Sequence, residues 1–396
     1  MERSRNAGPP RDRNAFRWVY SVSPWGNLTG ATNCALDHLL FLGPEIAAGC
    51  LILAHRGPLE ARARAMGVNT KCFAFENRGL RQASLWRKAT GFLPVLRSRW
   101  RYVRNLKNLL RAQPGILHVH SRMGASRYAL LGGRWAGVPI VLTLHEFPDK
   151  RKWAAWRDAW LIRRLANRVV AVSEATAQAY RPQFKNLPID VIRNALRIPQ
   201  ERASRSSEKV VFAMIGLLGP RKGTEEFLQA CARLRPAAVG FEAWLVGDWI
   251  STEERDKAVA RAAELGLPGC VVFRGAVADM AAIYRNIDFV VVPSHAETFS
   301  LVAMEGMGFG LPVVASAVGG LPELIVEGQT GFLVPAGDVQ ALADRIRGLV
   351  QDASLRQNMG EAGRERAMRL FAPESYARAM LDVYRALKGA GGFNRG

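Results

Sequence analysis

Two glutamates, Glu297 and Glu305, stand eight positions apart around an expected helix start. An apolar strand expected over Phe289–Val292 precedes Glu297, and a helical segment over Leu301–Met307 contains Glu305. At a rise of about 1.5 Å per residue, the two backbones would lie roughly 12 Å apart or less. This separation fits the span of a nucleotide diphosphate sugar, and it is too long for two carboxylates that share one proton.

The residues between the two glutamates add a candidate anion site. The backbone N–H groups of Phe299, Ser300 and Leu301 open the expected helix. Such groups have no partner inside the helix and lie at the positive end of its dipole, so they can bind a phosphate. Without the flanking motif, Glu297 would be read as a helix N-terminal carboxylate and Glu305 as a surface ion-pair partner.

A glycine-rich loop, GLLGPRKG, follows an apolar strand expected over Val210–Ile215. Its first glycine, Gly216, lets the backbone approach a ligand closely. Arg221 and Lys222 offer positive charge to a diphosphate, with an ordinary solvated loop as the alternative. The lysine precedes the last glycine, so the loop is not a Walker A motif. Gly247, in LVGDW, ends another expected strand and is a weaker candidate.

Apolar strands alternate with helix-length segments along the whole chain, which predicts βαβ units and parallel sheets. We expect an α/β protein of two Rossmann-like doubly wound domains, residues 1–200 and 201–372, joined by the polar stretch 200–209. Ligands would bind at the carboxyl ends of the strands, in a cleft between the domains. The strands expected in the first domain are 16–22, 50–54, 116–120, 139–144, 168–172 and 191–193.

The order of these motifs resembles a known family. GLLGPRKG, LVGDW and PSHAETFSLVAMEGMGFGLPVVASAVGGLPELIVEGQTGFLVPAGD are similar to the nucleotide-binding half of the retaining GT-B glycosyltransferases of family 4. The likeness covers residues 207–388. ILHVHS, TLHEF, VVAVSEAT and VIRNAL resemble landmarks of the family's acceptor-binding domain. The run within 373–388 resembles the family's last helix, which crosses back to the first domain.

The resemblance implies a role for each candidate of the second domain. Glu305 would hold the ribose hydroxyls of the donor nucleotide, and Glu297 would contact hydroxyls of the transferred sugar, because a carboxylate accepts two hydrogen bonds from a diol. Lys222 would neutralise the leaving diphosphate. The family usually has an arginine after the first glycine of the loop, where this chain has Leu217. Arg221 is therefore expected to substitute for it.

Three residues of the first domain match the family pattern as well. Gly30 lies in the glycine-bearing loop after the first strand, which in the family faces the donor phosphates. The family often has two adjacent glycines there, where this chain has Thr29 and Gly30, so this match is partial. His145, in TLHEF, matches the family histidine near the reacting sugar. His120, in HVHS, matches another and is a candidate on the acceptor side. A hydrogen-bonded core histidine is the alternative for each.

No DxD motif occurs in the chain, so neither a metal ion nor another cofactor is expected, and the co-substrate would be a nucleotide-diphosphate sugar. The resemblance implies that the anomeric configuration is retained by attack on the same face. A sugar-nucleotide epimerase or a phosphorylase on a similar fold is one alternative. A non-catalytic GT-B-like subunit that binds a membrane or a partner is the other.

The excess positive charge is confined to the first half. Residues 1–200 hold 33 Lys and Arg against 11 Asp and Glu, whereas residues 201–396 hold 22 against 23. Such asymmetry indicates that the first half faces a polyanion, with solubility as the alternative. No DNA- or RNA-binding motif accompanies the charge, so a nucleic acid partner is not expected.

A basic amphipathic segment points to a membrane as the polyanion. Residues 77–145 contain no acidic residue. Arg97, Arg101 and Arg104 form a basic stripe beside an apolar stripe that includes Trp100. This pattern suits an anionic membrane surface, and packing of the apolar stripe on the core is the alternative. We expect peripheral contact with the cytoplasmic face of a membrane and a lipid-linked or cell-surface glycan acceptor.

Composition favours a cytoplasmic protein. The five cysteines are scattered, without a CxxC pair, and read as free thiols in a reducing compartment. The N-terminal residues are charged and lack the apolar segment of a signal peptide. No apolar run is long enough to span a bilayer.

Overall fold

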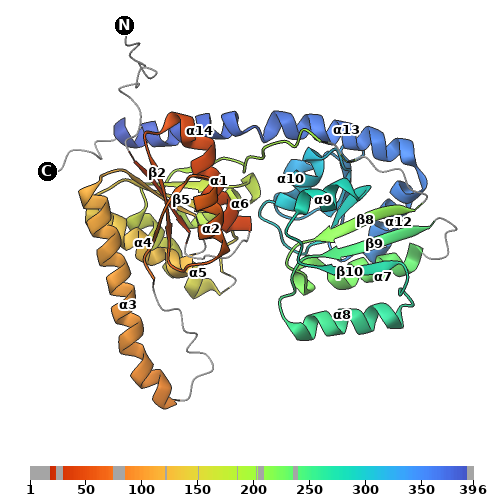
Figure 1. Cartoon of the computed structure of the whole chain (residues 1–396), viewed down its shortest axis with the longest axis horizontal. Helices are drawn as coiled ribbons and strands as arrows, with labels where there is room; N and C mark the ends of the chain where they lie inside the picture. Colours follow the sequence, from red (N-terminus) through yellow and green to blue (C-terminus); the bar gives the residue numbers. More distant parts are fainter. Residues whose placement is uncertain are drawn as a thin grey trace, which may run out of the picture. The chain divides into compact units, whose positions relative to one another are not determined.

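The structure is a computed structural model, shown in Figure 1. It describes residues 18–23, 30–74, 85–120, 123–149, 151–184, 186–201, 203, 209–234 and 240–389. The chain divides into two compact units. Unit 1 comprises Met1–Val170, Tyr180–Asp190 and Ala377–Gly396, and unit 2 comprises Ala171–Ala179 and Val191–Tyr376.

Unit 1 is built on a seven-stranded sheet with the order β3-β2-β1-β4-β5-β6-β7. Neighbours from β3 through β5 pair in parallel, with Val19 of β1 opposite Gly49 of β2 and Ile116 of β4. Side chains of β1, β4 and β5 are buried along their whole length, as expected for strands covered by helices on both faces. The strands are β1 (Val19–Ser23), β2 (Gly49–Leu53), β3 (Asn69–Cys72), β4 (Ile116–His120), β5 (Ile140–Leu144), β6 (Arg168–Ala171) and β7 (Ile189–Val191).

Helices connect these strands and cover the sheet. The helices of this part of the chain are α1 (Gly30–Leu42), α2 (Pro58–Ala65), α3 (Leu85–Ala112), α4 (Met123–Ala136), α5 (Lys152–Leu165) and α6 (Glu174–Phe184). Helices α3, α4 and α5 lie side by side (Figure 1). The last helix, α14 (Pro373–Gly389), contributes its residues from Ala377 onward to unit 1.

Unit 2 is a six-stranded parallel sheet with the order β10-β9-β8-β11-β12-β13. The order reverses between β8 and β11, and the carboxyl ends of strands at such a switch point are where doubly wound sheets bind ligands. The strands are β8 (Val210–Ile215), β9 (Phe241–Val246), β10 (Val271–Gly275), β11 (Phe289–Val292), β12 (Val313–Ser316) and β13 (Gly331–Val334).

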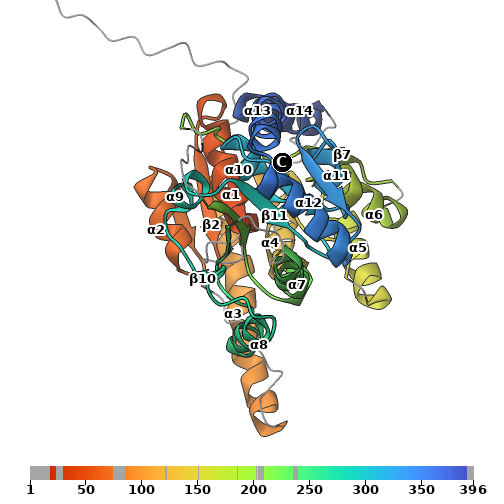
Figure 2. The same ribbon diagram turned by 90° about the vertical axis from the view of Figure 1, so that its right-hand side faces the viewer.

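Two apolar layers enclose this second sheet. On one face, α7 and α12 lie next to each other (Figure 2) and pack on a core in which Phe212 stacks on Phe289 at 4.8 Å between ring centroids. The other face is covered by α9 and α10. The helices of the unit are α7 (Thr224–Leu234), α8 (Thr252–Glu264), α9 (Met280–Arg285), α10 (Leu301–Gly308), α11 (Leu321–Leu324), α12 (Val339–Gln351) and α13 (Ala353–Leu370).

The expected fold class, two doubly wound α/β domains, is confirmed. The strand expected over 191–193 is wrong by two residues, because β7 spans Ile189–Val191. Contacts divide the chain at Val191 and Ala377 and assign Ala171–Ala179 to unit 2. Parts of the expected linker 200–209 and of the loop that precedes Gly30 lie outside the described residues. Within the described residues, no helix has the length and apolarity needed to cross a membrane.

Candidate functional site

Glycines bring the loops after β8 and β9 into close contact. Gly216 and Gly247 end these strands with positive φ angles of +138° and +128°. A Cβ atom on Gly247 would lie 1.9 Å from the carbonyl oxygen of Gly216. The N–H of Gly247 donates to the carbonyl oxygen of Gly275 at 2.7 Å. Only glycine fits at Gly247, so the sequence fixes a tight backbone corner at the carboxyl edge of the sheet.

The glycine-rich loop is also held against the turn that follows β11. Gly223 adopts a φ of +80°, and a Cβ atom there would lie 1.9 Å from the carbonyl oxygen of Pro293. The N–H of His295 donates to the carbonyl oxygen of Arg221 at 2.9 Å. In return, Nη1 of Arg221 donates to the carbonyl oxygen of Ala296 at 3.1 Å. The two loops therefore form one rigid surface.

Lys222 and Glu297 are joined by this arrangement. The Lys222 ammonium donates to Oε1 of Glu297 in an ion pair, and the hydroxyl of Ser294 donates to the same oxygen at 3.2 Å. The side chains of Lys222 and Glu297 are 18% and 8% exposed. Such low exposure strengthens the pair relative to one in water and makes the loss of either partner costly.

Helix α10 begins directly beyond this pair. Ser300 is its N-cap, and the Ser300 hydroxyl accepts a hydrogen bond from the N–H of Ala303 at 3.3 Å. Phe299 and Ser300 are buried, and Leu301 is the first helical residue. The expected helix start is thus confirmed, and its first N–H groups lie at the positive end of the helix dipole.

Glu305 is held separately from Glu297. The hydroxyl of Tyr284, on α9, donates to Oε2 of Glu305 at 2.7 Å. Burial, and next the Glu305 carboxylate, raise the pKa of Tyr284 well above its ordinary value, so the phenol stays a donor. The Tyr284 ring also stacks on Phe309 at 5.1 Å between centroids. Tyr284 orients Glu305, and no local sequence pattern indicated this contact.

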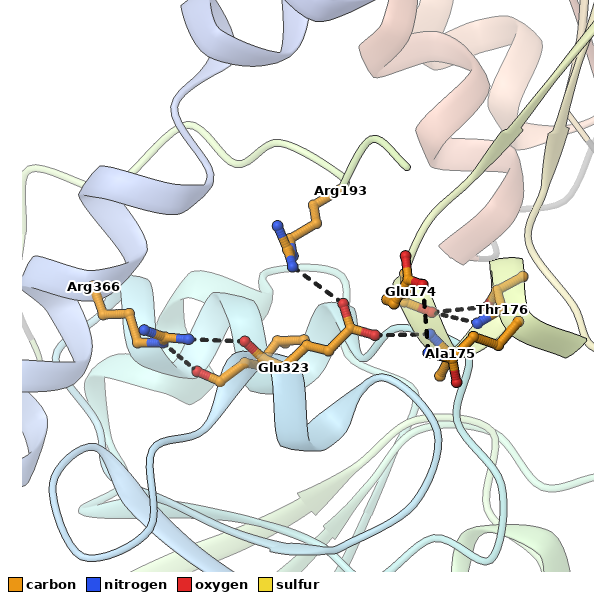
Figure 3. Close-up of polar contacts among 9 residues, drawn as sticks. Glu174, Ala175, Thr176, Arg193, Glu323 and Arg366 are labelled. Carbon is orange, nitrogen blue, oxygen red and sulfur yellow. Dashed lines mark hydrogen bonds and ion pairs between the residues drawn. The ribbon is translucent and has the colours of Figure 1, made fainter. Parts of the chain in front are cut away.

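A second group that the sequence did not indicate is centred on Glu323 of α11 (Figure 3). Gly320, at the start of α11, donates its N–H to the carbonyl oxygen of Glu297 at 3.0 Å. Three residues later, the Glu323 carboxylate accepts hydrogen bonds from the N–H of Ala175 at 2.9 Å and from Arg193 at 3.2 Å. Arg366 donates to the carbonyl oxygens of Glu323 and Leu324 at 2.9 and 2.7 Å. Ala175 belongs to VVAVSEAT and Arg193 to VIRNAL. The first motif from Ala171 onward and the whole of the second lie in unit 2.

The two candidate histidines of unit 1 are neighbours. Nδ1 of His120 lies 3.3 Å from Nε2 of His145, and His120 is fully buried whereas His145 is partly exposed. Burial lowers the pKa of His145 to about 4. Burial, and next the neighbouring histidines, lower the pKa of His120 well below its ordinary value. Both rings are therefore neutral at physiological pH.

A hydrogen-bonded chain lies next to these histidines. The Tyr384 hydroxyl, on α14, lies 2.7 Å from Nε2 of His38 and 2.6 Å from Nδ1 of His118. Nε2 of His118 lies 2.7 Å from the Thr143 hydroxyl. Burial is the main cause that lowers the pKa of His38, to about 3, and that of His118. Ring nitrogens of His38, His118 and His120 lie within 4.8 Å of one another, a spacing that could hold a metal ion. Both nitrogens of His118 already have partners, which fits a hydrogen-bonded core cluster better.

The remaining candidates lie on the surface of unit 1. Gly30 is exposed at the start of α1. On α3, Arg97, Arg101 and Arg104 are exposed and Trp100 is 54% exposed. The apolar stripe of the same helix is buried in the core, through Tyr102, Val103, Leu106 and Leu110. Core packing, the alternative for this stripe, is thus correct for Val103, Leu106 and Leu110, whereas Trp100 of the same stripe is exposed.

Comparisons with known proteins agree with this architecture. The fold resembles that of Anabaena HepE, solved in complex with UDP-glucose, with a TM-score of 0.80 at 21% identity over 94% of this chain and 100% of that chain. Two parallel sheets, each with alternating helices, and this likeness define a GT-B fold. Residues 59–198 match the model described as Glycosyltransferase Family 4, and residues 197–366 match Glycosyl transferases group 1.

Relatives in sequence are also named as enzymes that transfer sugars. The chain is 31% identical over 265 residues to the lipopolysaccharide core biosynthesis mannosyltransferase LpcC of Rhizobium leguminosarum, covering 64% of this chain and 73% of the relative. It is 28% identical over 299 residues to a glycogen synthase of Mycobacterium tuberculosis, covering 70% of each. The chain belongs to the family 4 glycosyltransferases, as the motifs indicated.

Proposed function

We propose that this glycosyltransferase moves a sugar from a UDP- or GDP-sugar to a lipid-linked or cell-surface glycan acceptor, with retention of the anomeric configuration. The observation that carries the proposal is the ion pair of Lys222 with Glu297, set beside the N-terminus of α10. A polysaccharide or lipopolysaccharide acceptor is supported by the names of the two relatives, a glycogen synthase and a lipopolysaccharide core mannosyltransferase.

Donor binding is assigned to unit 2. In this proposal Glu305, oriented by Tyr284, holds the ribose hydroxyls. Glu297 binds hydroxyls of the transferred sugar, since a carboxylate accepts from two neighbouring hydroxyls. The diphosphate lies on the glycine corner of Gly216 and Gly247 and on the amides of Phe299, Ser300 and Leu301, all at the carboxyl edge of one sheet.

The chemical step needs charge stabilisation above all. The bond between the anomeric carbon and the diphosphate oxygen breaks, and the acceptor hydroxyl forms a bond to that carbon from the same face. The proton of the hydroxyl passes to the departing phosphate oxygen. Lys222 and Arg221 supply positive charge to the oxygen that leaves. This proposal uses these cations and the helix dipole in place of a metal ion.

Unit 1 is assigned to the acceptor. The neutral imidazole of His145 is proposed to contact the reacting sugar, with His120 behind it at 3.3 Å. Gly30 is proposed to approach the donor phosphates, as the family pattern implies. The exposed residues Arg97, Trp100, Arg101 and Arg104 would contact an anionic membrane that carries the acceptor.

The experiment compares nucleotide sugars with and without an acceptor. Purified protein is screened against UDP- and GDP-sugars by thermal shift, and the donor that binds is then incubated with lipid-linked glycans. Release of nucleoside diphosphate together with a glycosylated product supports the proposal. Conversion of the donor in the absence of acceptor would identify an epimerase instead. Glu297→Gln is the matched inactive control, because it keeps the shape of the side chain.

A further inference from the structure

Helix α5 turns its largest apolar side chains outward. Trp153, Trp156 and Trp160 are 61%, 70% and 43% exposed. The helix is buried through small or medium side chains, namely Ala154, Ala159 and Ile162. Scattered exposed apolar residues are ordinary, but three large aromatic rings gathered on one element mark an interaction surface.

The three rings share one face. Their spacing of three and four residues places them in line along the helix. The line continues into Arg163 and Arg164, which are exposed. We call these five residues the α5 tryptophan face. The Arg164 guanidinium lies 4.8 Å from the centroid of the Trp160 ring, so aromatic and cationic groups are already in contact along this face.

The neighbouring helices extend the same chemistry. Helices α3 and α4 contain eight and two basic residues and no acidic residue, and α5 contains four basic residues and one acidic residue. That acidic residue, Asp158, is paired with Arg157 at 2.7 Å. Trp100 of α3 stacks on Trp135 of α4 at 5.4 Å between centroids. Every large exposed tryptophan of the described residues lies on these three helices, which stand side by side (Figure 1).

We propose that the α5 tryptophan face inserts into the headgroup region of an anionic membrane and anchors unit 1 there. Tryptophan rings are enriched at that depth because one edge is apolar and the other carries an N–H donor. Arginine extends its charge to anionic headgroups while its stem covers apolar surface. The inference rests on the membrane contact of the proposed function and names α5 as its anchor. It can fail while the donor and acceptor assignments hold, because vesicle binding needs neither donor nor acceptor.

The α5 tryptophan face follows closely in the chain on His145, a candidate residue of the proposed active site. Strand β5 ends at Leu144, His145 follows, and α5 begins at Lys152. A membrane bound by α5 would hold this segment near the lipid surface, where a lipid-carried acceptor lies. A nucleic acid strand would instead stack bases on open ring faces. The Arg157 guanidinium already lies over the Trp153 ring, 5.2 Å from its centroid, and the Arg164 guanidinium lies over the Trp160 ring. These contacts favour the membrane.

The test uses the full chain and sedimentation with vesicles of phosphatidylcholine, with or without phosphatidylglycerol. We expect wild type to bind only the anionic vesicles. The triple variant W153S/W156S/W160S should lose about tenfold or more of this binding, because interfacial affinity scales with the apolar area buried. The matched variant M66S/V259S/M368S removes three other exposed apolar side chains and should bind as wild type does.

Further arms make the outcome decisive. R163E/R164E should weaken binding most at low salt. Unfolding midpoints equal to wild type show that the variants are folded, and turnover of a water-soluble acceptor separates a lost anchor from a lost active site. Equal binding of wild type to neutral and anionic vesicles would overturn the proposal. Vesicle binding by the tryptophan variant at the wild-type level would overturn it as well. If the tryptophan variant changed from dimer to monomer and still bound vesicles as wild type does, the face would be a subunit interface and the proposal would be wrong.

Discussion

Lys222 and Glu297 form an ion pair that joins the loop after β8 to the turn after β11. The two residues are separated by 75 positions in the chain. Gly223, which allows the loop to approach Pro293, makes this contact sterically feasible. In the proposed function the sugar and the diphosphate bind at these same two side chains, so we expect the pair to couple the stability of unit 2 to its chemistry.

Replacement of Lys222 by methionine should lower both turnover and stability. The lost cation removes stabilisation of the leaving diphosphate, and kcat should fall by about 10²–10³. The Glu297 carboxylate, which is only 8% exposed, would also lose its cation. A buried carboxylate without a partner should lower the free energy of unfolding by on the order of 2 kcal/mol. Steady-state kinetics and urea unfolding measure the two effects.

The double variant Lys222→Met, Glu297→Gln is the control for this prediction. It should recover most of the lost stability, since no buried charge is left unpaired, while activity stays low. Recovery of activity in the double variant would contradict the assigned roles. Equal stability of wild type and Lys222→Met would show that the ion pair does not form in solution.

Arg221 is expected to matter as much as Lys222 for turnover. Leu217 stands where the family usually has an arginine, and a leucine offers no charge to the donor. Its side chain is 52% exposed. The Arg221 guanidinium already lies against the Glu297 turn through Ala296. We expect Arg221→Ala to lower kcat by about as much as Lys222→Ala, on the order of 10².

The position of Leu217 provides a gain-of-function test of the same idea. If Arg221 replaces the missing cation, Leu217→Arg should restore a large part of the activity of the Arg221→Ala variant. Leu217→Lys controls for charge without the planar guanidinium group. Wild-type kcat for Arg221→Ala would rule out its role at the diphosphate.

Tyr284 should set the affinity for the donor nucleotide. Its hydroxyl fixes Oε2 of Glu305 at 2.7 Å. Tyr284→Phe keeps the stacking on Phe309 and removes only this hydrogen bond, which is worth about 1–2 kcal/mol to a carboxylate. The KM for the donor should therefore rise by roughly 5–30-fold with little change in kcat. A selective fall of kcat at constant KM would place Glu305 elsewhere in the reaction.

Local sequence pattern was sufficient to predict the central strands and the start of α10. The strands Ile116–His120, Val210–Ile215 and Phe289–Val292 are where their apolar runs indicated. Each run is buried on both faces, so its composition alone specifies a central strand. The helix start at Ser300 was equally readable, because the cap and the following apolar residues are adjacent in sequence.

Contacts between distant segments could not be read in this way. Tyr384 and His38 lie 346 positions apart, and Glu323 and Ala175 lie 148 positions apart. Neither pair has a spacing that a periodic pattern could reveal. Two short elements were missed, β3 with the sequence NTKC and α11 with LPEL. Strand β3 is a partly exposed edge strand, and α11 has only four residues, so neither is long or apolar enough to show a hydrophobic period. The tryptophans of α5 could not be placed from hydrophobicity either. An amphipathic helix usually buries its large apolar side chains, whereas α5 exposes its three tryptophans and buries Ala154 and Ala159.

The histidines of unit 1 predict how stability depends on pH. His38, His118, His120 and His145 have folded-state pKa values below the ordinary 6.5, at about 3 for His38 and about 4 for His145. Between about pH 4 and 6.5 the unfolded chain binds protons that the folded chain excludes. Stability should therefore rise with pH across this window and become flat above it, by up to about 1.4 kcal/mol per pH unit for each histidine.

A variant at His38 isolates one part of this effect. His38 faces the Tyr384 hydroxyl at 2.7 Å and the rings of His118 and His120, and it has no assigned role in catalysis. His38→Gln keeps a hydrogen-bonding group at this position and removes one titrating ring. Urea unfolding at pH 4.5, 5.5, 6.5 and 7.5 should give a shallower slope for the variant than for wild type below pH 6.5. A wild-type stability that does not change between pH 4.5 and 6.5 would mean that these rings bind protons equally in both states.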